Sequence, residues 1–150
     1  MDVTQLIAIE EIKRLKARYF RYIDTKQWDA LRDLFTEDAS LSFAEITPAP
    51  YDRAGGIAMI RDALSQCVTI HHGHMPEIEI ESADVAHGIW AMEDILYWTD
   101  AGQGALGRAF TQGWGHYHES YRRFEGQWLI HALRLSRLRV ESLLPPVRIP

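Results

Sequence analysis

Three long runs of alternating apolar and polar residues constrain the fold of this chain more than any other feature. They are joined by short turns at residues 100–104 and 125–127, and they cover residues 85–98, 108–124 and 127–140. Alternation over such lengths is typical of half-buried antiparallel strands, in which successive side chains point to opposite faces. Strands this long bend, and we expect the bends at Gly113 and Gly115, because glycine tolerates the irregular backbone of a bulge.

The first third of the chain follows a helical period instead. Apolar side chains recur there at spacings of three and four residues, at Leu6, Ile9, Ile12, Leu15, Tyr19 and Ile23. This spacing predicts a helix that Thr4 caps at its N-terminus and that ends at or near Asp24. A short second helix, a strand, a loop and a third helix are expected next. The second helix contains Trp28, Leu31, Leu34 and Phe35, and the strand contains Ala39, Leu41 and Phe43. The loop contains Pro48, Pro50, Gly55 and Gly56, and the third helix contains Ile57, Ile60, Ala63 and Leu64.

Helices followed by a long curved antiparallel sheet predict an α+β fold, in which three N-terminal helices lie across one face of a cone-shaped sheet. Such an arrangement of layers encloses an apolar cavity. The 150 residues suit one domain with a single core. We expect that domain to span residues 1–143 and residues 144–150 to form an extended tail.

Composition argues against several classes of partner. The net charge of −5 offers no general attraction to nucleic acid or to an anionic membrane, and no apolar run approaches the ~20 residues of a membrane-spanning helix. Cys67 is the one cysteine, so no internal disulfide can form, and a cytoplasmic location is expected. The N-terminus reaches Glu10 and Glu11 without the apolar core of a signal peptide.

Residues 69–81 concentrate side chains that are able to carry chemistry. Three histidines stand here ahead of an alternating segment, namely His71, His72 and His74. Histidine is the usual proton shuttle and a common metal ligand, although a hydrogen-bonded structural role stays open for each of them. Strict alternation turns His71 away from the face of Ile78. A bulge near Gly73, or a break at Pro76, reverses this parity, so periodicity leaves the choice among the three histidines open.

Two charged residues stand on otherwise apolar strand faces. Asp94 shares its face with Trp90, Met92, Leu96 and Trp98, and Arg137 shares its face with Leu129, His131, Leu133 and Leu135. A buried charge without a partner is costly, so each needs a counter-ion, hydrogen bonds or a wet cavity. Either the two form an ion pair that only fixes the sheet, or both project into a ligand pocket. An ion pair between Asp94 and Arg137 would still allow both side chains to line such a pocket.

Several segments of the chain carry a family resemblance. They are residues 9–24 (IEEIKRLKARYFRYID), 26–29 (KQWD), 71–80 (HHGHMPEIEI), 92–96 (MEDIL) and 121–128 (YRRFEGQW). With these segments the chain resembles the SnoaL-like branch of the nuclear transport factor 2-like superfamily over nearly its whole length, and within that branch the bacterial bile-acid 7α-dehydratases. The helix motif that ends in Asp24 is widespread in the superfamily, whereas the His-x-Gly-His-x-Pro-Glu-Ile segment is more specific.

The resemblance implies a set of site residues and a chemistry. In those dehydratases a tyrosine, an aspartate, a histidine, a second aspartate and an arginine form the site, and by position they match Tyr19, Asp24, His71, Asp94 and Arg137. A hexachlorocyclohexane dehydrochlorinase of the same superfamily is similar to this chain at Asp24 and at residues 69–71, so an Asp–His elimination pair is the shared theme. The resemblance also implies a homo-oligomer, for which a trimer is favoured over a dimer. It implies no metal or organic cofactor.

The implied activity is that of a lyase, a dehydratase that eliminates water from a carbonyl-activated, hydroxylated polycyclic substrate of steroid-like or polyketide-like type. A polyketide cyclase or a ketosteroid-type isomerase with the same residue pair stays open, as does a non-catalytic module that binds small molecules. Residues 45–56 and 100–107 depart from the dehydratases. Such loops shape the mouth of the pocket, so the substrate itself stays open, including whether it is a coenzyme A thioester.

A metal site is a further alternative. The two candidate ligand groups are His72 and His74 with Glu79, and His116 and His118 with Glu119. Both follow the His-x-His and glutamate spacing that resembles cupins. Cupins are all-β proteins, whereas the first third of this chain is helical, so we expect no metal.

Overall fold

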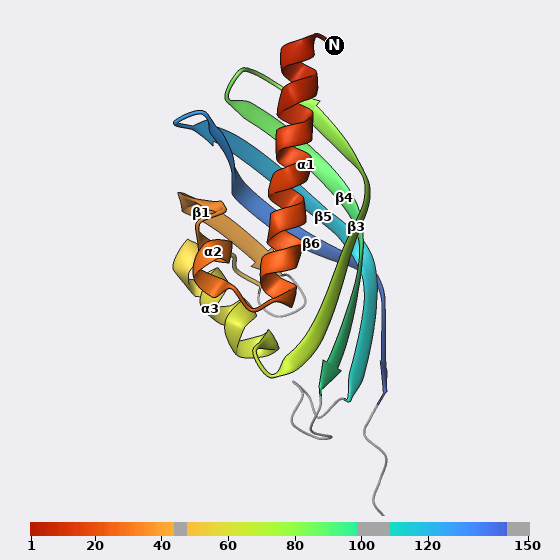
Figure 1. The fold of residues 1–150 in the computed structure, drawn as a ribbon. Helices are drawn as coiled ribbons and strands as arrows, with labels where there is room; N and C mark the ends of the chain where they lie inside the picture. Colours follow the sequence, from red (N-terminus) through yellow and green to blue (C-terminus); the bar gives the residue numbers. More distant parts are fainter. Residues whose placement is uncertain (44–47, 99–108, 144–150) are drawn as a thin grey trace, which may run out of the picture.

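A curved six-stranded sheet with helices on one face makes up the described part of the chain (Figure 1). The computed structural model describes residues 1–43, 48–98 and 109–143. In chain order its elements are α1 (Val3–Asp24), α2 (Trp28–Arg32), β1 (Phe35–Phe43), β2 (Tyr51–Asp52), α3 (Arg53–Leu64), β3 (Cys67–Ile80), β4 (Val85–Trp98), β5 (Phe110–Phe124) and β6 (Gln127–Leu143). The predicted α+β fold class is confirmed.

The strands lie in the order β2-β1-β6-β5-β4-β3. Strands β3 to β6 pair in antiparallel fashion, whereas β1 runs parallel to β6, so the sheet is mixed. Helix α1 crosses in front of the curved sheet, and α2 and α3 lie beside β1 (Figure 1). The apolar core fills the layer between α1 and the sheet.

The N-terminus of α1 is capped by Asp2 and not by Thr4. The Asp2 carboxylate accepts a hydrogen bond from the backbone N–H of Gln5 at 2.8 Å, and the Gln5 side chain accepts one from the N–H of Asp2 at 3.0 Å. These reciprocal bonds form a capping box, which satisfies N–H groups that have no partner within the helix. Thr4 therefore lies inside the first turn. The C-terminus of α1 falls at Asp24, as the helical period predicts.

Gly55 and Gly56 lie inside α3, which corrects the loop inferred from the sequence. The helix begins after Asp52, whose carboxylate accepts a hydrogen bond from the Gly55 N–H at 2.7 Å. A Cβ on Gly56 would lie 2.8 Å from the side chain of Leu41, so this glycine lets α3 come close to β1. Phe35 opens β1 instead of lying on a helix face.

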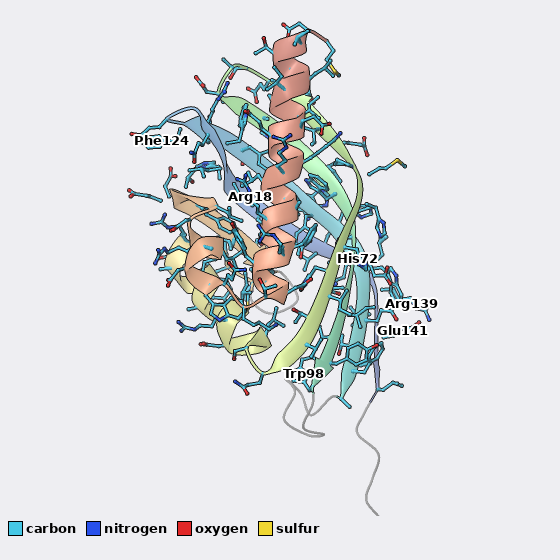
Figure 2. All side chains as sticks on the ribbon, in the orientation of Figure 1. Arg18, His72, Trp98, Phe124, Arg139 and Glu141 are labelled. Carbon is cyan, nitrogen blue, oxygen red and sulfur yellow. The ribbon has the colours of Figure 1, made fainter. Side chains whose placement is uncertain are left out.

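The histidine-rich stretch lies within β3 and not ahead of a strand. The pairing of β3 with β4 shifts register between Gly73 and Pro76, and this irregularity reverses the alternation of side chains. His71 is therefore buried on the helix side, whereas His72 and His74 are exposed. Figure 2 shows His72 on the side of β3 that faces away from α1.

A second irregularity affects β6. Its pairing with β5 skips His131. The buried residues of β6 are Trp128, Ile130, Leu133 and Leu135. Leu129 and His131 thus do not share a face with Arg137, which corrects the alternation inferred from the sequence. Arg137 keeps its predicted place on the inner face because the irregularity precedes it.

A charged pair is buried in the middle of the core. Lys16 of α1 and Glu119 of β5 form an ion pair, and both side chains are fully buried. The Lys16 Nζ lies 3.6 Å from the ring centroid of Tyr117 and 4.1 Å from that of Tyr19. The Tyr121 hydroxyl donates a hydrogen bond of 2.5 Å to Glu119. Burial lowers the pKa of Lys16 to about 8, although the negative charge of Glu119 opposes this shift.

Three further features complete the description. Cys67 is a buried free thiol, and burial raises its pKa. Among the described residues, none of the helices has the length and apolar character needed to cross a membrane. The predicted turn at residues 100–104 and the predicted tail at residues 144–150 lie outside the described residues.

Replacement of Lys16 tests how far the core depends on the buried ion pair. The Lys16→Met variant leaves Glu119 buried without its counter-ion, and we expect the free energy of unfolding to fall by about 3–5 kcal/mol. The double variant Lys16→Met/Glu119→Gln removes both charges and keeps an acceptor for Tyr121, so it should recover most of the loss. Urea denaturation measures both. A double variant no more stable than the single one would contradict this explanation.

Candidate active site

Asp24 and His71 meet where the C-terminus of α1 abuts β3. The His71 Nδ1 lies 2.7 Å from the Asp24 Oδ1, and the His71 backbone N–H donates a hydrogen bond to Oδ2 at 2.9 Å. The Thr69 hydroxyl donates a third bond, of 2.9 Å, to Oδ1. The His71 side chain is 4% exposed and that of Asp24 is 25% exposed, so the imidazole is withdrawn from bulk solvent.

Asp24 is held in its ionised form. Partial burial raises the pKa of this carboxyl, but the hydrogen bonds from His71 and Thr69 outweigh burial and leave the pKa of Asp24 below its ordinary value. A carboxylate accepts hydrogen bonds and cannot donate them, so the Nδ1 of His71 carries the proton in this pair. The Nε2 of the neutral ring is then the atom able to accept a proton.

An aromatic ring fixes the plane of the imidazole. Phe20 stacks on His71 with the ring centroids 6.1 Å apart and the planes inclined by 17°. Gly73 permits this arrangement, because a Cβ there would lie 2.5 Å from the Phe20 ring. The imidazole is thus oriented by Asp24 at one edge and by Phe20 on one face.

Asp94 and Arg137 form a two-pronged ion pair on the inner face of the sheet. Arg137 donates one hydrogen bond of 2.7 Å to each carboxylate oxygen of Asp94, which is 4% exposed. Gly113 lies between them in the sheet, and a Cβ there would be 2.3 Å from the Arg137 Nη1 and 2.6 Å from the Asp94 Oδ1. The glycine therefore makes room for the pair.

Tyr19 and Tyr117 connect this ion pair to α1. Their side chains are hydrogen-bonded to each other, and their ring centroids are 5.8 Å apart. Burial first, and then the neighbouring Tyr117 and Glu119, raise the pKa of Tyr19 well above its ordinary value. Burial and the negative charge of Asp94 likewise raise the pKa of Tyr117. Both phenols stay protonated at neutral pH, and because the bond between them uses one hydroxyl proton, the other hydroxyl is able to donate a further hydrogen bond.

The residues predicted for the site form two groups on the inner face of the sheet. One group is Asp24 with His71, and the other is Tyr19, Asp94 and Arg137. Phe20 stands between the groups, because its ring lies 5.6 Å from that of Tyr19 as well as 6.1 Å from that of His71. The structure thus brings the five residues into one helix–sheet layer.

Six residues near these groups have no place in the site predicted from the sequence. They are Lys16, Phe20, Lys26, Thr69, Tyr117 and Glu119. Lys16 lies on the apolar stripe of α1, and Glu119 alternates with apolar residues of β5. A charge on an apolar face is the signal that singled out Asp94, and it would also have found these two. Thr69 gives no such signal, because its role depends on contact with a distant helix end.

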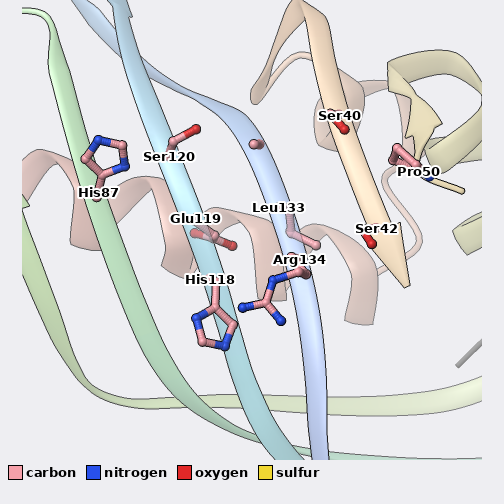
Figure 3. A pocket seen from close by; sticks show the side chains of 10 residues that line it. Ser40, Ser42, Pro50, His87, His118, Glu119, Ser120, Leu133 and Arg134 are labelled. Carbon is pink, nitrogen blue, oxygen red and sulfur yellow. The ribbon is translucent and has the colours of Figure 1, made fainter. Parts of the chain in front are cut away.

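The remaining histidines lie apart from this layer. His116 and His118 are on the outer face of β5, with ring centroids 6.3 Å apart. In residues 1–43, 48–98 and 109–143, no group of three or more His, Cys, Asp or Glu side chains is arranged to hold a metal ion. A shallow hollow of about 400 Å³ opens on this outer face between His118, Arg134 and Ser42, with α1 behind the sheet (Figure 3).

Sequence comparison identifies the family. Residues 4–134 match the SnoaL-like domain. This chain belongs to the SnoaL-like domain family. A protein of Gibberella zeae named "Probable cyclase FGR4" is 27% identical over 137 residues, which cover 85% of this chain and 89% of that protein. The family resemblance inferred from the sequence is thereby confirmed, and the closer likeness to bile-acid dehydratases stays a hypothesis.

Solved structures of other proteins share the fold over the full length of this chain. The hexachlorocyclohexane dehydrochlorinase LinA-type3 from Novosphingobium barchaimii superposes with a TM-score of 0.80 at 19% identity, covering 100% of this chain and 99% of that one. A proposed scytalone dehydratase from Novosphingobium aromaticivorans superposes with a TM-score of 0.79 at 21% identity, covering 100% of both chains. At these identities the comparison establishes the fold alone.

Replacement of Asp24 by Asn should lower stability in a pH-dependent way. Because the pKa of Asp24 is lowered by folding, its contribution is complete above the ordinary carboxyl value of about 3.9 and is lost as the pH falls through the folded-state value. At pH 7 we expect the variant to lose roughly 1.5–3 kcal/mol of unfolding free energy. Urea denaturation across the acid range measures this loss, and a loss that is equal at all pH values would contradict the linkage.

Proposed function

We propose that this protein is a dehydratase, a lyase without metal or organic cofactor that eliminates water from a hydroxylated polycyclic substrate activated by a carbonyl group. The observation that carries the proposal is the buried Asp24–His71 pair, with Nδ1 and Oδ1 2.7 Å apart, in a SnoaL-like domain. The names of two structurally similar proteins, a dehydrochlorinase and a proposed scytalone dehydratase, both denote eliminations and support this choice.

In the proposed reaction His71 is the general base. Its Nε2 takes a proton from the carbon next to the carbonyl, and the electron pair of that C–H bond passes through an enolate into the new C=C bond. The C–O bond then breaks, the departing hydroxyl takes up the proton that Nε2 had removed and leaves as water, and His71 returns to its neutral form. Asp24 holds the Nδ1–H tautomer and stabilises the imidazolium that forms. General-base catalysis of this kind contributes about 10²–10⁴-fold to the rate.

Tyr19, Asp94 and Arg137 complete the proposed site. Tyr19 stays protonated because burial raises its pKa, and we assign it to donate a hydrogen bond to the developing enolate or to the leaving hydroxyl. Asp94 and Arg137 form an ion pair, so together they offer a strongly polar contact without net charge within an apolar layer. We assign this pair to the polar groups of the substrate, which it would hold in one orientation.

Cyclisation is the second candidate activity, and the identity of 27% to a protein named as a cyclase favours it. Proton abstraction next to a carbonyl begins both reactions, so the same Asp24–His71 pair serves either. The two differ in the fate of the enolate, which either expels a hydroxyl group or attacks a second carbonyl within the substrate. The polyketide-like substrates of the proposal contain groups for both outcomes.

We further propose that the protein is a cytoplasmic homo-oligomer, and we favour a trimer over a dimer. The location is supported by the single cysteine, which forms no internal disulfide. The oligomer is supported only by the family resemblance. Light scattering of the purified chain tests it directly, and a monomer at micromolar concentration would contradict it.

Turnover of hydroxy-ketones tests the proposed function. A panel of steroid-like and polyketide-like hydroxy-ketones is incubated with the purified protein, and mass spectrometry detects the loss of one water per molecule. We expect His71→Ala and Asp24→Ala each to lower kcat by about 10²–10⁴-fold, because each removes part of the general base. Circular dichroism of the two variants checks that the fold is retained.

A matched control lies next to His71 in the same strand. His72 is exposed on the other side of β3, so His72→Ala should keep full activity. Full activity in His71→Ala would overturn the proposed mechanism. Tight binding of panel members to the unaltered protein without any turnover would favour the non-catalytic binding module. Ring closure without loss of water would favour the cyclase.

A further inference from the structure

The chain leaves α1 through a turn that normally contains glycine. The backbone N–H of Lys26 donates a hydrogen bond of 3.1 Å to the Ile23 carbonyl, and that of Gln27 donates one of 2.8 Å to the Tyr22 carbonyl. This pair of bonds defines the Schellman motif, whose left-handed position is usually occupied by glycine. Here that position is Lys26, with φ of 60°. A side chain in this conformation costs stability relative to glycine, so the lysine calls for a reason of its own.

The Lys26 ammonium group points back to the end of the helix. Its Nζ donates a hydrogen bond of 2.9 Å to the Thr69 Oγ1, and Thr69 in turn donates one of 2.9 Å to the Asp24 Oδ1. The same oxygen lies 2.7 Å from the His71 Nδ1. Lys26, Thr69, Asp24 and His71 therefore form a continuous chain of hydrogen bonds, which we call the Lys26–His71 chain.

The direction of this chain is set by the chemistry of its members. An ammonium group only donates hydrogen bonds, so Thr69 must accept from Lys26. The hydroxyl of Thr69 has one proton, and with its oxygen engaged by Lys26 that proton is directed at Asp24. Asp24 is thereby kept in the acceptor role, which in turn keeps the proton of the imidazole on Nδ1. Each link determines the next.

The charges around the chain come from two elements. Asp24 at the end of α1 and Lys26 just after it face His71 and Cys67 of β3. The Lys26 Nζ also lies 5.8 Å from the ring centroid of Trp28. Burial lowers the pKa of Lys26, while Cys67 and Asp24 oppose that shift. The half-buried ammonium is thus a positive group that reaches the carboxylate through the Thr69 hydroxyl.

We propose that Lys26 is a positioning residue, which acts through Thr69 to keep Asp24 ionised and aligned with His71. This inference rests on the proposed function, in which His71 is the base. It explains why a lysine occupies a left-handed position that glycine would fill at lower cost. Lys26 itself touches no reacting atom in this scheme, and it works only through its hydrogen bond to Thr69.

The substitution Lys26→Gly separates the two roles of this residue. Glycine relieves the left-handed backbone, so the melting temperature should stay equal or rise. Loss of the ammonium should nevertheless raise the pKa of Asp24, which carbon-13 NMR of the labelled carboxylate measures without any substrate. With a substrate from the panel, we expect kcat to fall about tenfold, less than the 10²–10⁴-fold expected from losing the base, with little change in KM.

Three further variants act as controls. Thr69→Val removes the middle hydroxyl and should raise the pKa of Asp24 as Lys26→Gly does. Thr69→Ser keeps the hydroxyl, so the pKa of Asp24 should stay as in the unaltered protein. Lys13→Met removes the same charge from an exposed lysine of α1 that pairs with Glu10, and it should leave the Asp24 titration unchanged.

The outcomes are distinct from those of the functional test. An Asp24 titration that is unchanged in Lys26→Gly would overturn the inference, whatever the enzyme does. A lower melting temperature of Lys26→Gly with an unchanged titration would show that the lysine is only structural, and would also overturn it. Full activity of His71→Ala would instead remove the proposed function and leave the titration result standing.

Discussion

The hydrogen bonds that β3 donates to Asp24 hold the end of α1 and the candidate site together. A carboxylate at a helix C-terminus faces the partial negative charge of exposed carbonyl groups, and on its own it would be unfavourable there. Donors from Thr69 and His71 offset that repulsion and tie α1 to the sheet. Because the same bonds orient the imidazole, the packing of the helix end and the geometry of the site depend on each other.

Two buried ion pairs bring charge into the same helix–sheet layer. Lys16 pairs with Glu119, and Arg137 pairs with Asp94. Such a pair adds little net stability compared with apolar residues, but the loss of one partner is costly because the other charge stays buried. The layer thus contains charged groups with fixed partners, which suits the proton transfer that we propose for this site.

Much of the fold could be predicted from local patterns, and the exceptions have physical reasons. The alternation over residues 85–98 corresponds to β4, because the two-residue period of a strand is a local property. The hydroxyl of Thr4 is a good cap and predicts the start of α1 there, but Asp2 supplies the capping box together with Gln5. Gly56 suggested a loop, although its lack of a side chain serves the contact between α3 and β1.

Local patterns are enough to predict the helix that ends at Asp24 and the inner-face positions of Asp94 and Arg137, because these depend on periods that local geometry imposes. Periodicity left open which histidine meets Asp24, and although the family resemblance indicated His71, the physical cause lies in the folded sheet. The register shift that follows Gly73 reverses the alternation in β3, and no local pattern states where a strand takes up an irregularity. The contact of Lys26 with β3 was likewise decided only by the path of the folded chain.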